Sequence, residues 1–260
     1  MFLSLFNSFA SAKFPPDVVC LQDPPFWRTH LPSFQNYTLF APPGGTGNKS
    51  KVAFYLSTHL LAQATVLPAF FDRPDVVALD LFGVDLFGKS FSHFRILNLY
   101  NLWPKRTSQM TVSPLVAFPE TSFPTLVVGD FNIHHPVPDL LRSYSADELA
   151  TSLPYFSRSS ELGFSLLNQP GVYTRFPLDG PGRPSVLDLS FASPLLLHFC
   201  QTWDTPLPST GSDHVPVQII LSHPLTSPPP PSPNWSLTDW PTLAPRLKDF
   251  IVPPPPSLPT

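Results

Sequence analysis

Proline is the residue that most restricts how this chain can fold: 37 of its 260 residues are proline, and they stand mainly between short apolar runs. Proline has no backbone N–H and fixes its own φ angle, so it interrupts helices and central strands. The pattern therefore favours many short strands joined by irregular loops over long helices.

The remaining composition indicates a folded domain with little charge. Hydrophobic residues make up 42% of the chain, with 23 phenylalanines, and the length favours one large domain over two. Charged residues are only 13% and the formal net charge is -3. A global basic field for nucleic acid is therefore excluded, and any such contact must be local.

Neither a disulfide scaffold nor a membrane span is expected. Cys20 and Cys200 each lie in an apolar stretch and are predicted to be buried free thiols. No apolar run approaches the roughly 20 residues of a membrane span. The first twelve residues lack the basic start of a signal peptide, and their phenylalanines fall at helical spacing, so we expect a helix packed on a sheet.

The stretch from Leu126 to Asn132 has the pattern of a buried strand that ends in polar groups. Its branched apolar residues suit a strand covered on both faces, and Gly129 allows the backbone to bend. If the extended geometry persists, Asp130 and Asn132 point to one side and Phe131 into the core. A carboxylate beside an amide can hold a water, or a metal with a phosphate oxygen, although a simple Asx turn is the alternative.

The rest of the chain is predicted to alternate strands with one substantial helix. The helix covers 145–167, with Ser145 as its N-cap and Pro154 splitting it. Strands are predicted at 17–23, 37–41, 51–57, 65–71, 76–82, 94–100, 126–129, 172–176, 186–191, 195–202 and 215–221. The domain covers residues 1–222, and 223–260 form a proline-rich tail with a short amphipathic segment between its two proline runs.

Acidic and amide side chains stand at or beside the ends of several predicted strands: Asp23, Tyr100 with Asn101, Asp130 with Asn132, Asp188, and Asp213 with His214. Loop ends gather at one edge of a sheet, so these groups are expected to converge. Several carboxylates in one cleft repel each other unless a cation lies among them. Oxygen ligands without a cysteine cluster favour Mg²⁺ or Mn²⁺ over zinc.

Five motifs resemble, in order, those of the endonuclease/exonuclease/phosphatase superfamily, which has the DNase I-like fold: Leu21-Gln22-Asp23-Pro24, Leu99-Tyr100-Asn101, Gly129-Asp130-Phe131-Asn132, Ser185-Val186-Leu187-Asp188-Leu189 and Ser212-Asp213-His214-Val215-Pro216. The resemblance covers residues 1–222 and is strongest to endonuclease domains of fungal non-LTR retrotransposons. It implies an α/β (α+β) fold, a four-layer sandwich of two mostly antiparallel sheets flanked by helices. The family's first strand, which carries an asparagine, is expected to be missing here.

The resemblance also implies roles for individual residues. Asp130 would orient or deprotonate the attacking water, Asn132 would hold water and a phosphate oxygen, Tyr100 would donate to the phosphate, and Asp188 would fix the tautomer of His214. Asp23, where the family has glutamate, and Asp213 would bind the metal. The expected substrate-binding residues are Asn101, Thr174, Arg175 and Arg183.

Three functions follow as alternatives. The first is divalent-metal-dependent nicking of DNA, with contacts to the phosphate backbone and a fused or associated reverse transcriptase, in the nucleus or the cytoplasm and not in a secreted protein. The second is hydrolysis of a small phosphate by the same fold. The third is a catalytically silent module whose proline-rich tail binds a partner protein.

Overall fold

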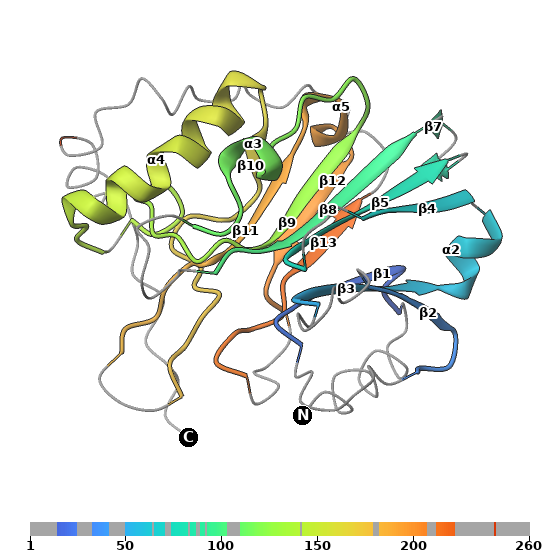
Figure 1. The fold of residues 1–260 in the computed structure, drawn as a ribbon, viewed down its shortest axis with the longest axis horizontal. Helices are drawn as coiled ribbons and strands as arrows, with labels where there is room; N and C mark the ends of the chain where they lie inside the picture. Colours follow the sequence, from blue (N-terminus) through green and yellow to red (C-terminus); the bar gives the residue numbers. More distant parts are fainter. Residues whose placement is uncertain are drawn as a thin grey trace.

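A computed structural model describes residues 15–24, 33–41, 50–63, 65–70, 74–82, 84–86, 89–91, 93–102, 110–140, 142–178, 182–206 and 212–221, together with Thr242. Two β-sheets stacked face to face form its centre, with helices on the outer face of the larger sheet (Figure 1). The α/β fold with two stacked sheets is as predicted, and among the described residues helices cover the outer face of the larger sheet.

The larger sheet has six strands in the order β10-β11-β9-β8-β5-β4. Strands β8 and β9 pair in parallel, and every other neighbouring pair in this sheet is antiparallel. The strands are β4 (Thr65–Phe70), β5 (Val76–Phe82), β8 (Phe94–Tyr100), β9 (Thr125–Asp130), β10 (Ser165–Leu166) and β11 (Asp188–Ala192).

The smaller sheet has three antiparallel strands in the order β1-β3-β2. They are β1 (Val18–Gln22), β2 (Tyr37–Phe40) and β3 (Val52–Ser57). Two further pairs of strands are β6 (Val84–Leu86) with β7 (Lys89–Phe91), and β12 (Cys200–Asp204) with β13 (Gln218–Leu221). Short helices α2 (Thr58–Gln63), α3 (Pro114–Ala117) and α5 (Pro194–Leu197) connect the strands.

Alternation along the strands of the larger sheet creates two separate cores. Leu126 and Val128 of β9 face the smaller sheet and pack with Val52 and Phe54 of β3. Val127 faces the other way, into a core closed by α3 and by α4 (Ala146–Glu161). A buried amide joins the two sheets, because the Asn98 Nδ2 donates to the backbone oxygens of Leu21 and Ala53, 3.0 Å away in each case.

Helix α4 begins as predicted, but Pro154 does not split it. Ser145 caps the helix, and its hydroxyl and the Glu148 side chain bond each other's backbone N–H groups in a capping box. The helix continues through Pro154 to Glu161. Burial of Tyr155 and Phe156 against the larger sheet offsets the hydrogen bond that proline removes.

Two predicted strands are wrong. Residues 172–176 form no strand, and Arg175 makes only isolated bridges to Ser185 and His214. The predicted strand 195–202 begins instead as helix α5, because Ser193 followed by Pro194 is a helix start. The expected helix in residues 1–12 and nearly all of the tail 223–260 lie outside the described residues. None of the described helices has the length and apolar character that crossing a membrane requires.

Candidate active site

Tyr100, Asp130 and Asp188 form a row across three neighbouring strands of the larger sheet. Tyr100 is opposite Asp130 in the parallel β8–β9 pair, and Asp130 is opposite Asp188 in the antiparallel β9–β11 pair. Asp130 lies two residues after Val128, so both side chains are on the face toward the smaller sheet. The register of the sheet therefore brings together residues far apart in the sequence.

Gly129 permits β8 and β9 to approach each other at this row. Its φ is +152°, and a Cβ placed on it would stand 2.0 Å from the backbone oxygen of Leu99 on β8. No side chain fits into that gap, because the clashing atom is backbone and cannot move aside alone. The glycine is required by the packing of the two strands that carry the site.

Asp130 is buried and is held by Asn132. The Asp130 side chain is 5% exposed. Its Oδ1 accepts from the backbone N–H of Asn132 at 2.9 Å, and its Oδ2 accepts from the Asn132 side chain at 3.1 Å. Asn132 has a φ of +50°, so the strand has ended there, while Phe131 is fully buried as predicted. The Asx turn therefore forms, and it fixes the Asp130 carboxylate within the row.

Asp188 and His214 form a second hydrogen-bonded pair beside Asp130. Their contact joins His214 Nδ1 to Asp188 Oδ2 at 2.8 Å. Burial alone would lower the pKa of His214, but the hydrogen bond and charge of Asp188, with the charges of Asp130 and Asp213, raise that pKa to about 9. The imidazole is therefore held in one orientation by a carboxylate, which favours its protonated form.

The three side chains Asp130, Asp188 and His214 converge: one ligand atom from each lies within 4.8 Å of the others. Burial raises the pKa of Asp130 well above its ordinary value, and the neighbouring Asp188 carboxylate raises it further, while His214 opposes the shift. Two carboxylates this close repel each other, so a bound cation would stabilise their charged forms. The carboxylate oxygens of the two acids suit Mg²⁺ or Mn²⁺.

The two acids predicted as metal ligands, Asp23 and Asp213, lie outside this cluster, and each is in an ion pair. Lys51 Nζ is 2.5 Å from Asp23 Oδ1, and Arg175 Nε is 2.8 Å from Asp213 Oδ2. Tyr100 Oη donates to the other Asp23 oxygen at 3.5 Å. Asp23 and Asp213 are thus near residues of the site, but basic side chains already neutralise them.

Two predicted substrate-binding residues, Asn101 and Thr174, are fully buried and have structural partners. The Asn101 side chain donates to Tyr155 Oη and accepts from the backbone N–H of Val112, at 2.9 Å each. Thr174 Oγ1 accepts from the backbone N–H groups of Leu187 and Asp188 at 3.1 and 3.0 Å. Neither side chain is therefore open to a substrate. Thr174 instead has a positioning role, because it fixes the start of the strand that carries Asp188.

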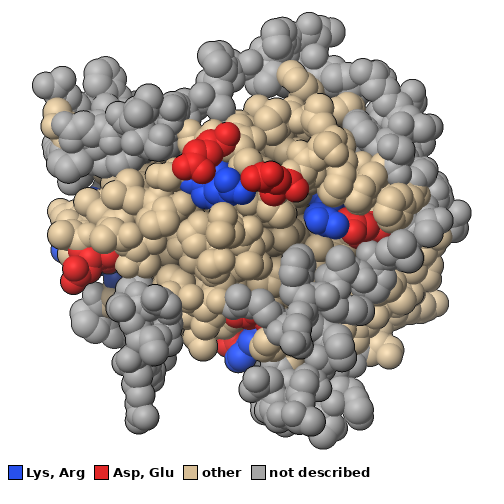
Figure 2. Space-filling view, turned by 45° about the horizontal axis from the view of Figure 1, so that its top comes forward, with Lys and Arg blue, Asp and Glu red and all other residues tan. Residues whose placement is uncertain are grey.

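The predicted basic residues are distributed differently. Arg175 is half-buried in its ion pair with Asp213, whereas Arg183 is exposed. On the face seen in Figure 2 charged side chains are few, and the blue groups in view lie beside red ones. Among the described residues, Arg183 is thus the predicted phosphate contact most open to solvent.

Sequence analysis missed Lys51 and Asn168. Asn168 donates to the backbone oxygen of Asp188 at 2.8 Å and accepts from the N–H of Ser190 at 2.9 Å, so it supports the strand that carries Asp188. Lys51 could have been identified from its place as the first residue of the predicted strand 51–57, but only strand pairing shows that it faces Asp23. Both residues act through partners that are distant in sequence.

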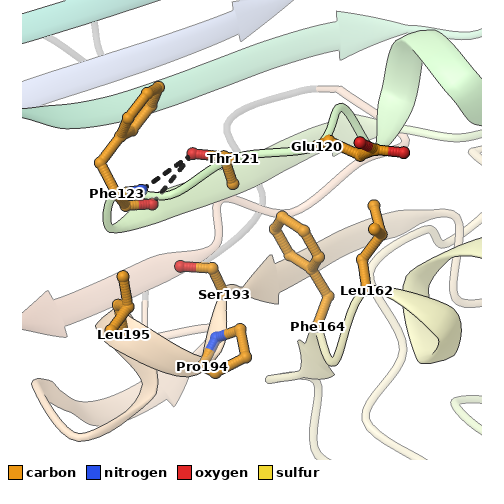
Figure 3. Close-up of a pocket in the computed structure, with 8 residues that line it drawn as sticks. All are labelled: Glu120, Thr121, Phe123, Leu162, Phe164, Ser193, Pro194 and Leu195. Atoms are coloured by element: carbon orange, nitrogen blue, oxygen red, sulfur yellow. Dashed lines mark hydrogen bonds between the residues drawn. The ribbon is translucent and has the colours of Figure 1, made fainter.

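Two cavities lie near the larger sheet. One, of about 300 Å³, adjoins the site and is lined by Asn132, Ile133, His134, Glu148 and Thr151. The other, of about 330 Å³, is at the opposite end of β9 and β11, where Phe123, Phe164, Ser193 and Pro194 contribute to a mostly apolar lining (Figure 3). The distant cavity contains no group of the cluster.

Comparison with known proteins agrees with this fold. The model of the Endonuclease/Exonuclease/phosphatase family matches residues 7–214. The endonuclease domain of TRAS1, a telomere-specific non-LTR retrotransposon, is similar with a TM-score of 0.57 and 15% identity, over 84% of this chain and 90% of that one. The AP endonuclease LMAP from Leishmania major is similar with a TM-score of 0.64 and 17% identity, over 85% of this chain and 83% of that one. No curated protein matches the sequence.

Proposed function

We propose that this chain, which belongs to the Endonuclease/Exonuclease/phosphatase family, nicks DNA by hydrolysing a phosphodiester bond with a divalent metal ion. The convergence of Asp130, Asp188 and His214 carries the proposal. The motifs that resemble retrotransposon endonucleases, and the fold likeness to the TRAS1 domain, support an endonuclease of that type.

The residues of the cluster fit a divalent ion. Asp130 and Asp188 would hold it through carboxylate oxygens. Burial, and then the charge of Asp188, raise the pKa of Asp130, and a bound cation would favour its deprotonated form against both effects. When bound, Mg²⁺ or Mn²⁺ supplies positive charge against the charge that develops on the phosphate in the transition state.

The protein's own groups then have separable roles. The deprotonated Asp130 carboxylate orients the attacking water and accepts its proton, and the Asn132 side chain holds that water and a phosphate oxygen. His214, fixed by Asp188 through Nδ1, presents its other nitrogen as a proton donor to the phosphate or leaving oxygen. Tyr100 donates a hydrogen bond to the phosphate; burial, then the charges of Asp23 and Asp130, raise its pKa to about 12, so its hydroxyl stays protonated.

A polymer substrate is favoured by the shape and exposure of this edge. Asp23 and Asp213, on either side of the buried row, have side chains that are 48% and 36% exposed, so the site opens to solvent along the sheet edge. Arg183 is exposed and can contact a phosphate backbone. An open edge accepts a phosphate within a long strand, whereas a small phosphate gains more from an enclosed pocket.

The test is conversion of supercoiled plasmid to nicked circles with Mg²⁺, run beside release of phosphate from inositol phosphates. We expect Mg²⁺-dependent nicking that a chelator abolishes and that Asp130→Asn lacks. Release of phosphate from inositol phosphates without nicking of the plasmid would assign the site to a small substrate. Nicking that continues in the presence of the chelator would contradict the proposed dependence on a divalent metal ion.

A further inference from the structure

We propose that Lys51 is a resident cation of this active site: its ammonium fills the position at Asp23 that a divalent ion would take, so the chain binds one divalent ion, at Asp130 and Asp188. This inference rests on the proposed function, because it concerns the metal that the function requires. It gives a role to a residue that the mechanism above does not use.

The position of Lys51 is fixed by strand pairing. In the β1–β3 ladder Gln22 is opposite Val52, so Asp23 and Lys51 are the next pair beyond the ladder. The Asp23 N–H donates to the Lys51 backbone oxygen at 2.8 Å, and the Lys51 N–H donates to the Pro74 oxygen at 2.6 Å. Both backbone groups of Lys51 are therefore anchored, and its side chain starts from a defined point facing Asp23.

The ammonium of Lys51 lies between the Asp23 carboxylate and the Tyr100 ring. Its Nζ lies 2.5 Å from Asp23 Oδ1 and 5.7 Å from the centre of the Tyr100 ring. The Tyr100 hydroxyl donates to the other oxygen of the same carboxylate. One Asp23 oxygen is thus used by a cation and the other by a hydrogen-bond donor, which leaves the carboxylate neutralised.

Charge then decides where a divalent ion binds. A second divalent ion at Asp23 would have to displace a positive group from 2.5 Å and would repel it afterwards. The described residues place no basic side chain of Lys or Arg in an ion pair with Asp130 or Asp188, whose repulsion favours a cation. The protein therefore supplies one ammonium group at the position where a two-metal site would hold its second ion.

The alternative interpretation is that Lys51 and Asp23 form an ordinary surface ion pair with no effect on metal binding. Such exposed pairs contribute only about 0–1 kcal/mol to stability. The Lys51 side chain is 39% exposed, so its replacement is compatible with folding. The two interpretations differ in the number of metal ions that the protein binds when the ammonium is removed.

The experiment counts Mn²⁺ ions bound per chain, by electron paramagnetic resonance of free Mn²⁺, in the wild type, Lys51→Met and Lys51→Arg. Lys51→Met keeps the length of the side chain without its charge, and Lys51→Arg keeps the charge. We expect one ion in the wild type and in Lys51→Arg, and a second, weaker ion in Lys51→Met. The second ion should be lost again in Lys51→Met/Asp23→Asn.

Equal counts and affinities in the wild type and Lys51→Met would overturn the proposal, and so would two ions in the wild type. The count needs no catalysis, so it separates this inference from the proposed function. One ion in the wild type and two in Lys51→Met, without nicking of DNA by the wild type, would uphold the role of Lys51 and refute the nuclease.

Discussion

At the scale of single residues, Asp130 and His214 are the side chains on which hydrolysis should depend most. Asp130→Asn removes the acceptor of the water's proton, and His214→Gln removes the proton donor. Each group of this kind contributes about 10²–10⁴-fold to rate. We therefore expect either change to lower the nicking rate of supercoiled plasmid by that factor while the circular dichroism spectrum stays unchanged.

Arg158→Lys is a suitable control, because Arg158 pairs with Glu120 and Glu161 on the outer surface of α4. It should nick at the rate of the wild type. Full activity in Asp130→Asn would show that the assigned proton acceptor is another group.

Thr174 gives a second prediction at this scale. Thr174→Val keeps the shape of the side chain but leaves the buried N–H groups of Leu187 and Asp188 without their acceptor. An unpaired buried donor costs about 1–3 kcal/mol. Urea unfolding should show that Thr174→Val lowers the free energy of unfolding by that amount for each unpaired N–H. Thr174→Ser, which keeps the hydroxyl, should lower it much less.

Nicking should fall in Thr174→Val as well, because the start of β11 positions Asp188. Equal stability of the two variants would mean that the hydroxyl does not support this strand.

At the scale of elements, the contact between β8 and β9 depends on Gly129. A Cβ at this position would meet the backbone of Leu99 at 2.0 Å, so Gly129→Ala must push the two central strands apart. We expect a loss of more than about 4 kcal/mol in the free energy of unfolding, which is exceptional for a single substitution. Chemical denaturation, or the yield of folded protein, measures the effect.

Gly171→Ala is the matched control for that change. Gly171 also has a positive φ, of +80°, but a Cβ there would meet no atom within 4 Å. The substitution should cost only the backbone strain of about 1–2 kcal/mol. Similar losses in the two variants would show that strain at glycine, and not the approach of the strands, sets the cost.

At the scale of the whole molecule, the cluster should make stability depend on pH. The pKa values of Asp130 and His214 are both raised by folding, Asp130 by burial and by Asp188, and His214 by Asp188 against the effect of burial. The folded protein therefore holds more protons than the unfolded chain above the ordinary pKa of each group. The contribution of His214 is fully present below about pH 6.5 and is lost as the pH rises to about 9.

Without metal, the melting temperature should therefore fall as the pH rises from 6 to 9, and Mg²⁺ should reduce this fall by binding the deprotonated carboxylates. Differential scanning calorimetry over this range, with and without Mg²⁺, measures both effects. The fall should be smaller in Asp130→Asn and in His214→Gln. If the melting temperature falls by the same amount in both variants and in the wild type, the cluster does not control the pH dependence of stability.

The sequence by itself determined much of the local structure and the family. The strands 76–82 and 94–100 and the Ser145 N-cap were predicted correctly, because apolar runs and capping residues act over a few neighbouring positions. The order of five motifs also identified the family, since the same residue types recur at the ends of strands.

Only the tertiary structure decided which of these residues meet. The parallel pairing of β8 with β9 and the register of β9 with β11 place Asp130 beside Tyr100 and Asp188, while Lys51 and Arg175 hold Asp23 and Asp213 in ion pairs. Tertiary packing also buries Asn101 and Thr174, and it stabilises α4 so that the helix continues past Pro154. Local periodicity specifies which face of a strand a residue occupies, but strand register and burial depend on contacts between distant segments, so the sequence pattern does not contain them.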